Sequence, residues 1–181
     1  GKTPTFGGYS THIVTDEHFV LRIPNGLDPA GAAPLLCAGI TTWSPLRHVG
    51  VGKGDHVAIL GLGGLGHMGV KLARSLGADV TVLSRSPSKQ SDAEKLGATD
   101  FVLTQDPAVW GSMANRFDYI LDTVSAKHDI ASALGSLKRD GTLIMVGAAP
   151  LPLDLPVFPL IFARRRILGS LVGGLRETQE M

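Results

Sequence analysis

The sequence predicts an α/β fold, built on a doubly wound parallel sheet of about six strands. Three observations predict it: a strand, glycine turn and helix over residues 55–76, short apolar runs alternating with helical patterns after them, and turn residues in between. A near-continuous apolar run such as Asp79–Leu83 is typical of a buried parallel strand. Right-handed crossovers between such strands place helices on both faces of one sheet.

Two strand-like segments precede the first strand–helix unit. Gly7–Val14 reads as a glycine turn followed by an extended run, and Phe19–Pro24 reads as a second short strand. We expect both to belong to another domain or to its edge. Asp28 then caps a short helix that has Pro29 at its first position, and a longer helix is expected over Leu35–His48.

The rest of the chain alternates strand and helix. The expected strands are Val57–Leu60, Asp79–Leu83, Asp100–Leu103, Phe117–Asp122, Thr142–Val146 (after an Asp140–Gly141 turn) and Ile167–Val172. The expected helices are Met68–Leu76, Ser88–Leu96, Pro107–Met113, Asp129–Leu137 and the start of one at Arg176–Met181. Proline-rich residues 147–159 predict an irregular segment, and Arg164–Arg166 a solvated loop or strand entry.

The glycine turn predicts a dinucleotide site, because it lies between a strand and a helix and a second strand follows. Gly61 permits a tight turn, Gly63 leaves room for a pyrophosphate, and Gly66 lets the helix pack closely on the strand. The free N–H groups and the positive end of the helix would face the diphosphate. The cofactor-binding residues expected here are Gly61, Leu62, Gly63, Gly64, Leu65 and Gly66.

The residues after the second strand indicate which nicotinamide cofactor is bound. NAD-binding units of this type carry an Asp or Glu there, whereas this chain has no carboxylate between Ser84 and Lys89. Serine hydroxyls and two cations would receive a 2′-phosphate, at about 1.5–3 kcal/mol for a charge-assisted contact. We therefore expect NADP(H), bound through Ser84, Arg85, Ser86 and Lys89. The alternative is a solvated loop in which Ser86 or Ser88 only caps the next helix.

Composition narrows the functional classes. The chain has 181 residues and a net charge of +1, which is ordinary for a globular protein and not basic enough to indicate nucleic-acid binding. No apolar stretch has membrane-spanning length and no leader pattern begins the chain, so a cytoplasmic protein acting on a small molecule is expected. One cysteine excludes an internal disulfide and a cysteine-rich zinc knuckle.

Several motifs together resemble the zinc-dependent medium-chain alcohol dehydrogenases, most of all their cinnamyl alcohol dehydrogenase branch. They are APLLCAGIT at 33–41, SPL at 44–46, GLGGLGHMGVKLA at 61–73, GGYS at 7–10, DTV at 122–124, GS at 169–170 and ETQEM at 177–181. The resemblance covers essentially the whole chain and implies a Rossmann domain inserted into a zinc-bearing catalytic domain. We therefore expect residues 1–31 to be a partial, β-rich catalytic-domain segment, 32–175 the dinucleotide-binding domain, and 176–181 the start of a truncated C-terminal catalytic segment.

The resemblance also implies site residues. Cys37 matches the last ligand of the catalytic zinc, and Thr41 a position at the nicotinamide end of the cofactor. A thiolate suits zinc, although a single cysteine on an apolar helix is more often a small buried residue. The other zinc ligands and the proton relay are expected upstream of Gly1, so the chain alone should be inactive and bind zinc poorly. Matching positions along the carboxyl ends of the strands are Thr123, Gly147, Ser170, Leu171 and Val172, and His67 is expected near the cofactor.

The leading interpretation is an NADP(H)- and zinc-dependent alcohol dehydrogenase or aldehyde reductase, which transfers hydride between NADP(H) and a primary alcohol or aldehyde. One alternative is an NADP(H)-binding module without catalysis. Another is a zinc-free quinone reductase of the same superfamily, which Cys37 disfavours. The apolar last strand, Ile167–Val172, needs cover, and it predicts a homodimer in which two copies pair there across a two-fold axis.

Overall fold

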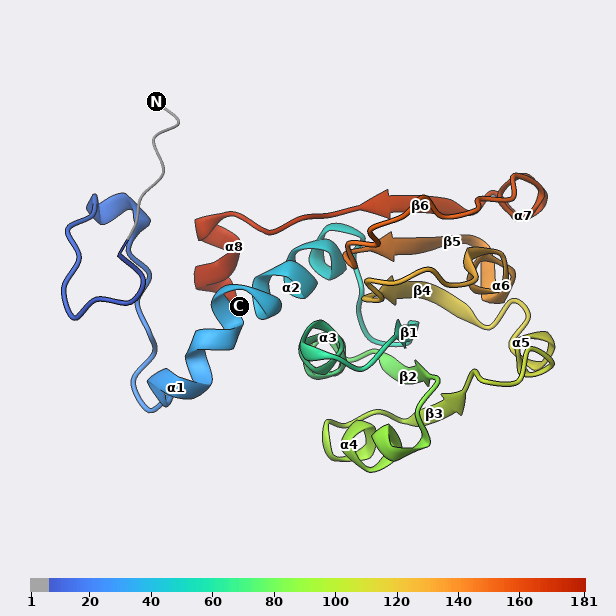
Figure 1. Ribbon diagram of the computed structural model, residues 1–181, viewed down its shortest axis with the longest axis horizontal. Coiled ribbons are helices and arrows are strands. Elements are labelled where there is room, and N and C mark those ends of the chain that lie inside the picture. Colours follow the sequence, from blue (N-terminus) through green and yellow to red (C-terminus); the bar gives the residue numbers. More distant parts are fainter. Residues whose placement is uncertain (1–6) are drawn as a thin grey trace.

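The computed structural model describes residues 7–181, and its framework is one six-stranded sheet in the order β3-β2-β1-β4-β5-β6 (Figure 1). The strands are β1 (His56–Leu60), β2 (Asp79–Ser84), β3 (Asp100–Leu103), β4 (Phe117–Asp122), β5 (Leu137–Met145) and β6 (Arg166–Gly169). All neighbouring pairs are parallel. The expected doubly wound parallel sheet is confirmed.

Helices cover both faces of the sheet. One face carries α2 (Ala38–His48), α3 (Gly64–Ser75) and α4 (Gln90–Lys95), and the other carries α5 (Val109–Ser112), α6 (Ile130–Ser136) and α7 (Phe158–Ala163). Side chains along β1 alternate between the two cores: Val57 and Ile59 pack on the first face, Ala58 and Leu60 on the second. Because both faces of the central strand are buried, β1 is apolar at every position after His56.

The two strands expected at the N-terminal end do not form, so that prediction was wrong. Residues 7–27 are irregular apart from a 3₁₀ turn, η1 (Glu17–Phe19), which Asp16 caps. A strand needs a neighbour for its backbone N–H and C=O groups, and among residues 7–181 no extended segment pairs with either run. Residues 1–6 of the expected segment 1–31 lie outside the described residues.

The predicted start of the long helix was also wrong by three residues. Asp28 caps α1 (Pro29–Ala32) as expected, accepting a hydrogen bond from the Gly31 amide. A 3₁₀ turn, η2 (Ala33–Leu36), then precedes α2. Pro34 lacks an N–H donor, and the chain changes direction at Cys37 (φ −128°, ψ −74°), so the helical run divides there.

Three further differences lie in the C-terminal half. β5 starts at Leu137 rather than Thr142, because Leu137 already pairs with Phe117 of β4. A bulge at residues 138–141, where Asp140 takes a positive φ of 62°, stands where the turn was expected, and Thr142 then pairs with Tyr119. α7 forms in a stretch that was expected to be irregular up to Pro159, where proline suits the first helical turn. β6 ends at Gly169, so residues 170–172 continue as an irregular segment before α8 (Leu175–Glu180).

The Arg164–Arg166 cluster is not simply solvated. Arg164 is exposed and its Nε lies 2.8 Å from Asp140 Oδ1. The guanidinium of Arg165 is partly buried and donates to the carbonyl oxygens of Leu137 (2.7 Å from Nη2) and Pro159 (3.1 Å from Nη1). Arg165 therefore ties α7 to the start of β5.

The N-terminal segment contacts the C-terminal helix. The Arg22 backbone N–H donates to Gln179 Oε1 (2.9 Å), and Gln179 Nε2 donates to the Arg22 carbonyl (3.1 Å). Figure 1 shows this segment and α8 at the α1 end of the molecule, away from β3. Within residues 7–181, no helix is long and apolar enough to cross a membrane.

We predict that Gly66→Ala destabilises the fold by about 3 kcal/mol or more, because a Cβ there would lie 2.2 Å from the Gly61 carbonyl oxygen. Gly64→Ala is the matched control: it adds the same methyl group to the first residue of α3, where nothing lies within 4 Å. That control should keep or raise the stability by up to about 1 kcal/mol. Urea unfolding measures both, and equal stabilities would contradict the close packing described.

Candidate functional site

A cavity of about 450 Å³ lies at the carboxyl ends of β1, β2 and β4. From β1 the chain proceeds outward to β2 and β3, and then crosses to β4 on the other side. Ligands of open α/β sheets bind at such a reversal of strand order. The residues lining the cavity are Leu60, Gly61, Leu83, Ser84, Arg85, Thr104, Gln105, Pro107, Trp110, Val124, Ala126, Lys127, His128 and Asp129.

The glycine turn forms one edge of this site. Gly61 has a φ of +89° and donates its N–H to the Leu83 carbonyl (2.9 Å), while Gly66 lies against the Gly61 carbonyl. The space beside Gly63 is open, since a Cβ added there would meet nothing within 4 Å. No side chain caps the start of α3, so its first N–H groups are free to bind an anion. His67 Nδ1 donates to the Gly63 carbonyl (2.7 Å), beside the turn as expected.

Thr123 holds the glycine turn against the end of β4, and Gly147 lies against the residues that follow β4. The Thr123 hydroxyl lies 2.9 Å from the Leu60 carbonyl oxygen and 3.2 Å from that of Gly61. Gly147, just after β5, lies very close to the loop that follows β4. A Cβ at Gly147 would be 2.4 Å from the Val124 carbonyl oxygen, so only glycine fits there. Both residues thus lie at the carboxyl ends of the strands, next to the cavity.

The opposite edge of the cavity carries the serines and cations that follow β2. Ser84 is buried and accepts a hydrogen bond from the Ser86 N–H (3.1 Å), which shapes the loop. Arg85 is exposed, lines the cavity and makes no ion pair with any residue from 7 to 181. Lys89 is half-buried in η3 (Pro87–Lys89) and does not line the cavity. The Arg85 guanidinium is therefore available to an anionic group.

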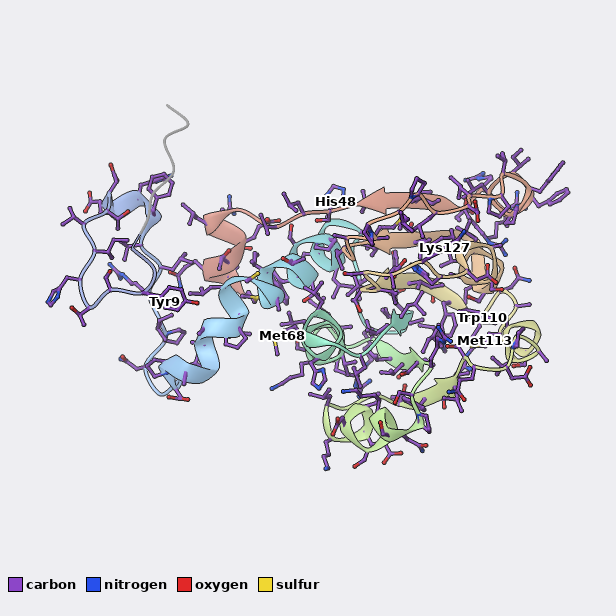
Figure 2. All side chains as sticks on the ribbon, in the orientation of Figure 1. Tyr9, His48, Met68, Trp110, Met113 and Lys127 are labelled. Atoms are coloured by element: carbon purple, nitrogen blue, oxygen red, sulfur yellow. The ribbon has the colours of Figure 1, made fainter. Side chains whose placement is uncertain are left out.

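The loop between β4 and α6 supplies a third wall. Asp122 ends β4 almost fully buried, and its carboxylate accepts from the Val124 N–H (3.0 Å) and meets His128 Nε2 at 2.7 Å. Burial raises the pKa of Asp122, although the Val124 amide and His128 act in the opposite direction. Asp129 instead caps α6, and the hydrogen bond from Ser132 lowers the pKa of its carboxyl group. Figure 2 shows Lys127 and Trp110 on the α5–α6 side of the sheet, where they line this cavity.

Other predicted site residues lie apart from the cavity. Cys37 is exposed at the start of α2, and Thr41 is buried one turn later, donating its N–H to the Cys37 carbonyl (3.0 Å). Ser170 follows β6, and the side chains of Leu171 and Val172 are exposed. In the described part of the chain, no three His, Cys, Asp or Glu side chains form a group that could hold a metal ion. The assignment of these five residues stays a prediction, as does that of the other expected site residues.

Several cavity residues were missed from the sequence. They follow β3 and β4 directly: Thr104, Gln105, Pro107, Trp110, Ala126, Lys127 and His128. The available indication was positional, because any residue just after a central parallel strand is a candidate for the ligand site. The pairing of His128 with Asp122 depends on the path of the loop, which no residue spacing indicates.

Comparisons with known proteins agree on one family. Residues 64–181 match the family model described as zinc-binding dehydrogenase. The NADP-dependent alcohol dehydrogenase C 1 of Mycolicibacterium smegmatis is 55% identical over 99% of this chain and 51% of its own length. Among solved structures, a cinnamyl alcohol dehydrogenase from Sorghum bicolor aligns with a TM-score of 0.87 at 43% identity, over 91% of this chain and 47% of that one. CAD from Helicobacter pylori, complexed with NADP(H), aligns with a TM-score of 0.85 at 41% identity, over 96% and 50%. The chain thus spans about half the length of these relatives.

We predict that Thr123→Val destabilises the fold by about 1 kcal/mol, because it removes the hydroxyl that holds the Leu60 and Gly61 carbonyl oxygens while keeping the side-chain shape. Thr123→Ser is the control, since it keeps the hydroxyl. Thermal unfolding of both variants tests this. A valine variant as stable as the serine variant would show that the hydroxyl does not hold the turn.

Proposed function

The chain belongs to the zinc-binding dehydrogenase family, and we propose that it is the NADP(H)-binding part of an alcohol dehydrogenase or aldehyde reductase. The observation that carries this proposal is the cavity at the strand-order reversal, with the glycine turn at one edge and the Arg85 loop at the other. The reaction proposed for the whole protein is hydride transfer between NADP(H) and a primary alcohol or aldehyde. The cofactor supplies the hydride chemistry, and this chain binds and orients it.

The glycine turn would bind the pyrophosphate. Gly63 leaves its backbone open to a close approach, and the uncapped start of α3 offers N–H donors together with the positive end of the helix dipole. Both features favour a diphosphate over an uncharged ligand. The six residues from Gly61 to Gly66 would make these contacts through the backbone, since the Leu62 side chain is buried in the core.

The loop after β2 would bind the 2′-phosphate that distinguishes NADP(H) from NAD(H). Arg85 lines the cavity without an ion-pair partner in the described residues, and the hydroxyls of Ser84 and Ser86 lie beside it in the loop. Lys89, one helical turn further on, would add charge at longer range. Two relatives support the choice: one is named NADP-dependent, and the other was solved with NADP(H).

Cys37 and Thr41 would face the reacting end of the cofactor, as the family resemblance implies. A lone exposed thiol does not make a zinc site, and no group of three potential ligands lies within residues 7–181. We therefore assign Cys37 as one zinc ligand on the family resemblance alone. Thr123, Gly147 and residues 170–172 are likewise assigned, on the resemblance, to positions that line the cofactor along the carboxyl ends of the strands.

We also propose a homodimer through the free edge of β6. This strand is the last in the sheet, with β5 on one side and no strand within residues 7–181 on the other. Leu171, just beyond it, is 83% exposed, and Val172 is 55% exposed. An open apolar edge is an aggregation hazard unless a second copy covers it.

We predict that the chain binds NADPH more tightly than NADH by about tenfold or more, because Arg85 adds a charge-assisted contact to the 2′-phosphate. Arg85→Glu should abolish or reverse that preference by weakening NADPH binding while leaving NADH binding nearly unchanged. Isothermal titration calorimetry at one salt concentration measures all four affinities.

The matched control for this charge reversal is Arg139→Glu, at an exposed position near the start of β5 and outside the cavity lining. It should keep the NADPH preference of the unchanged chain. An Arg85→Glu chain that still prefers NADPH would contradict the phosphate assignment. Equal affinities in the unchanged chain would contradict the choice of NADP(H).

We predict that the chain is dimeric at a concentration of about tens of micromolar, because two copies that pair at β6 across a two-fold axis would cover each other's open edge. Leu168→Lys, on β6 itself, would also disturb the core, so the sharper test is Leu171→Lys at the exposed position beyond the strand. That variant should shift the light-scattering mass toward the monomer. A monomeric mass for the unchanged chain would rule out this interface.

A further inference from the structure

The helix α7 is apolar on every side, although one side of it faces solvent. Its six residues, Phe158–Ala163, include no polar side chain, so no polar face is available to turn outward. Leu160 packs against the core on the α6 side of the sheet. Phe158 (70% exposed), Ile161 (64%) and Phe162 (77%) form the outer face, and the rings of the two phenylalanines stack with their centroids 5.7 Å apart. A helix that is apolar all round is normally buried, so we expect a partner to cover this outer face.

A second exposed apolar segment lies at the other end of β6. The side chains of Leu171 and Val172 follow the strand and are both exposed. Figure 1 shows the arrangement: α7 lies at the start of β6, and residues 170–174 lead from its other end to α8. Neither residues 158–163 nor residues 170–173 include a charged side chain. The free edge of β6 is therefore flanked by uncharged, apolar surface at both ends.

A two-fold pairing of β6 with its own copy would bring these two segments together. Two copies of one strand that pair across a two-fold axis run antiparallel, so the residues before the strand in one copy lie beside the residues after it in the other. The outer face of α7 in each copy would therefore meet residues 171–172 of its partner, and the same contact would form twice. One symmetry operation thus covers both exposed apolar segments of both copies.

The area that a dimer must bury also favours a second copy as the cover. β6 has four residues, whereas a stable interface uses about 20–30 residues and about 800 Å² on each side, so the strand alone is too small. A buried aromatic side chain contributes about 150–250 Å², so Phe158 and Phe162 at their observed exposure would add roughly 200–350 Å² in each copy. Ile161, Leu171 and Val172 add to this. The flanking segments therefore supply much of the area that the strand lacks.

We propose that the outer face of α7 is an interface between two copies of this chain, in which α7 of one copy packs against Leu171 and Val172 of its partner. The inference rests on the homodimer proposed above and adds to it a reciprocal contact outside the strand. It does not depend on the cofactor, because neither α7 nor residues 171–172 line the cavity at the strand-order reversal.

The test is a charge exchange between copies, read as the light-scattering mass at about tens of micromolar. Phe162→Glu places a carboxylate against the apolar residues of the partner, and Leu171→Lys places an ammonium group against the partner's α7. Each variant alone should dimerise about tenfold or more weakly than the unchanged chain, because an unpaired charge would have to be buried twice in each dimer. An equal mixture of the two variants should return to the dimer mass. Each mixed dimer then contains one pair of opposite charges and one unchanged apolar contact, which is possible only if the two positions meet between copies.

Phe19→Glu is the matched control, since Phe19 is an exposed phenylalanine in η1, at the opposite end of the molecule from α7 (Figure 1). It should keep the dimer mass, and circular dichroism should show the same fold in every variant. Phe158→Glu, on the same face of α7, replaces Phe162→Glu if that variant fails to fold.

The outcomes separate this contact from the homodimer and from the cofactor assignment. A dimer that Phe162→Glu does not weaken, or a mixture that stays monomeric, would overturn the contact while leaving the pairing at β6 standing. A monomeric unchanged chain would overturn the homodimer and this inference with it, and would leave the outer face of α7 to be covered by residues outside this chain. NADPH binding by the unchanged chain is measured separately, and neither result changes that assignment.

Discussion

The close approach of α3 to the end of β1 is the constraint on which the site depends. Gly66 lies directly against the Gly61 carbonyl oxygen, and one turn later Gly69 packs against Leu121 of β4 and Ile59 of β1. Only a helix without side chains at these positions can lie this low on the sheet. The approach directs the uncapped start of α3 at the reversal of strand order, so the anion-binding end of the helix and the cavity coincide.

A second set of contacts surrounds that turn from the β4 side. The Thr123 hydroxyl reaches the carbonyl oxygens that end β1, and Asp122 turns its buried carboxylate back to the loop that follows. These polar groups are costly to bury and stay there because each has a partner. These hydrogen bonds join the cavity wall directly to the ends of β1 and β4, so the sheet fixes the position of the wall. A loop fixed in this way is pre-organised for a ligand and loses little freedom on binding.

The sequence predicted the parts of this molecule that local chemistry decides. The glycine turn, the alternating strands and the family resemblance were all confirmed. Each of these predictions rested on short continuous segments of the sequence. The strand predicted at Phe19–Pro24 failed because pairing is non-local, and apolar alternation cannot supply a neighbour. Arg165 looked solvated for the same reason: its carbonyl partners on α7 and β5 meet only after folding. The contact of His128 with Asp122 could not be predicted, because no residue spacing indicates a side chain that a loop returns to the end of its own strand.

The two segments assigned to a second domain meet in space, which bears on how the chain is organised. Residues around Arg22 pair with Gln179, Ser44 donates to Glu177, and Gly39 of α2 lies against Met181. A domain inserted into another must leave and re-enter its host at neighbouring points, because the host core has to close around both junctions. The entry near α1 and the exit at α8 satisfy that condition. The boundaries expected near residues 31 and 176 agree with this arrangement and stay a prediction. The contact of α8 with α2 places the end of the described chain beside the helix that Cys37 precedes.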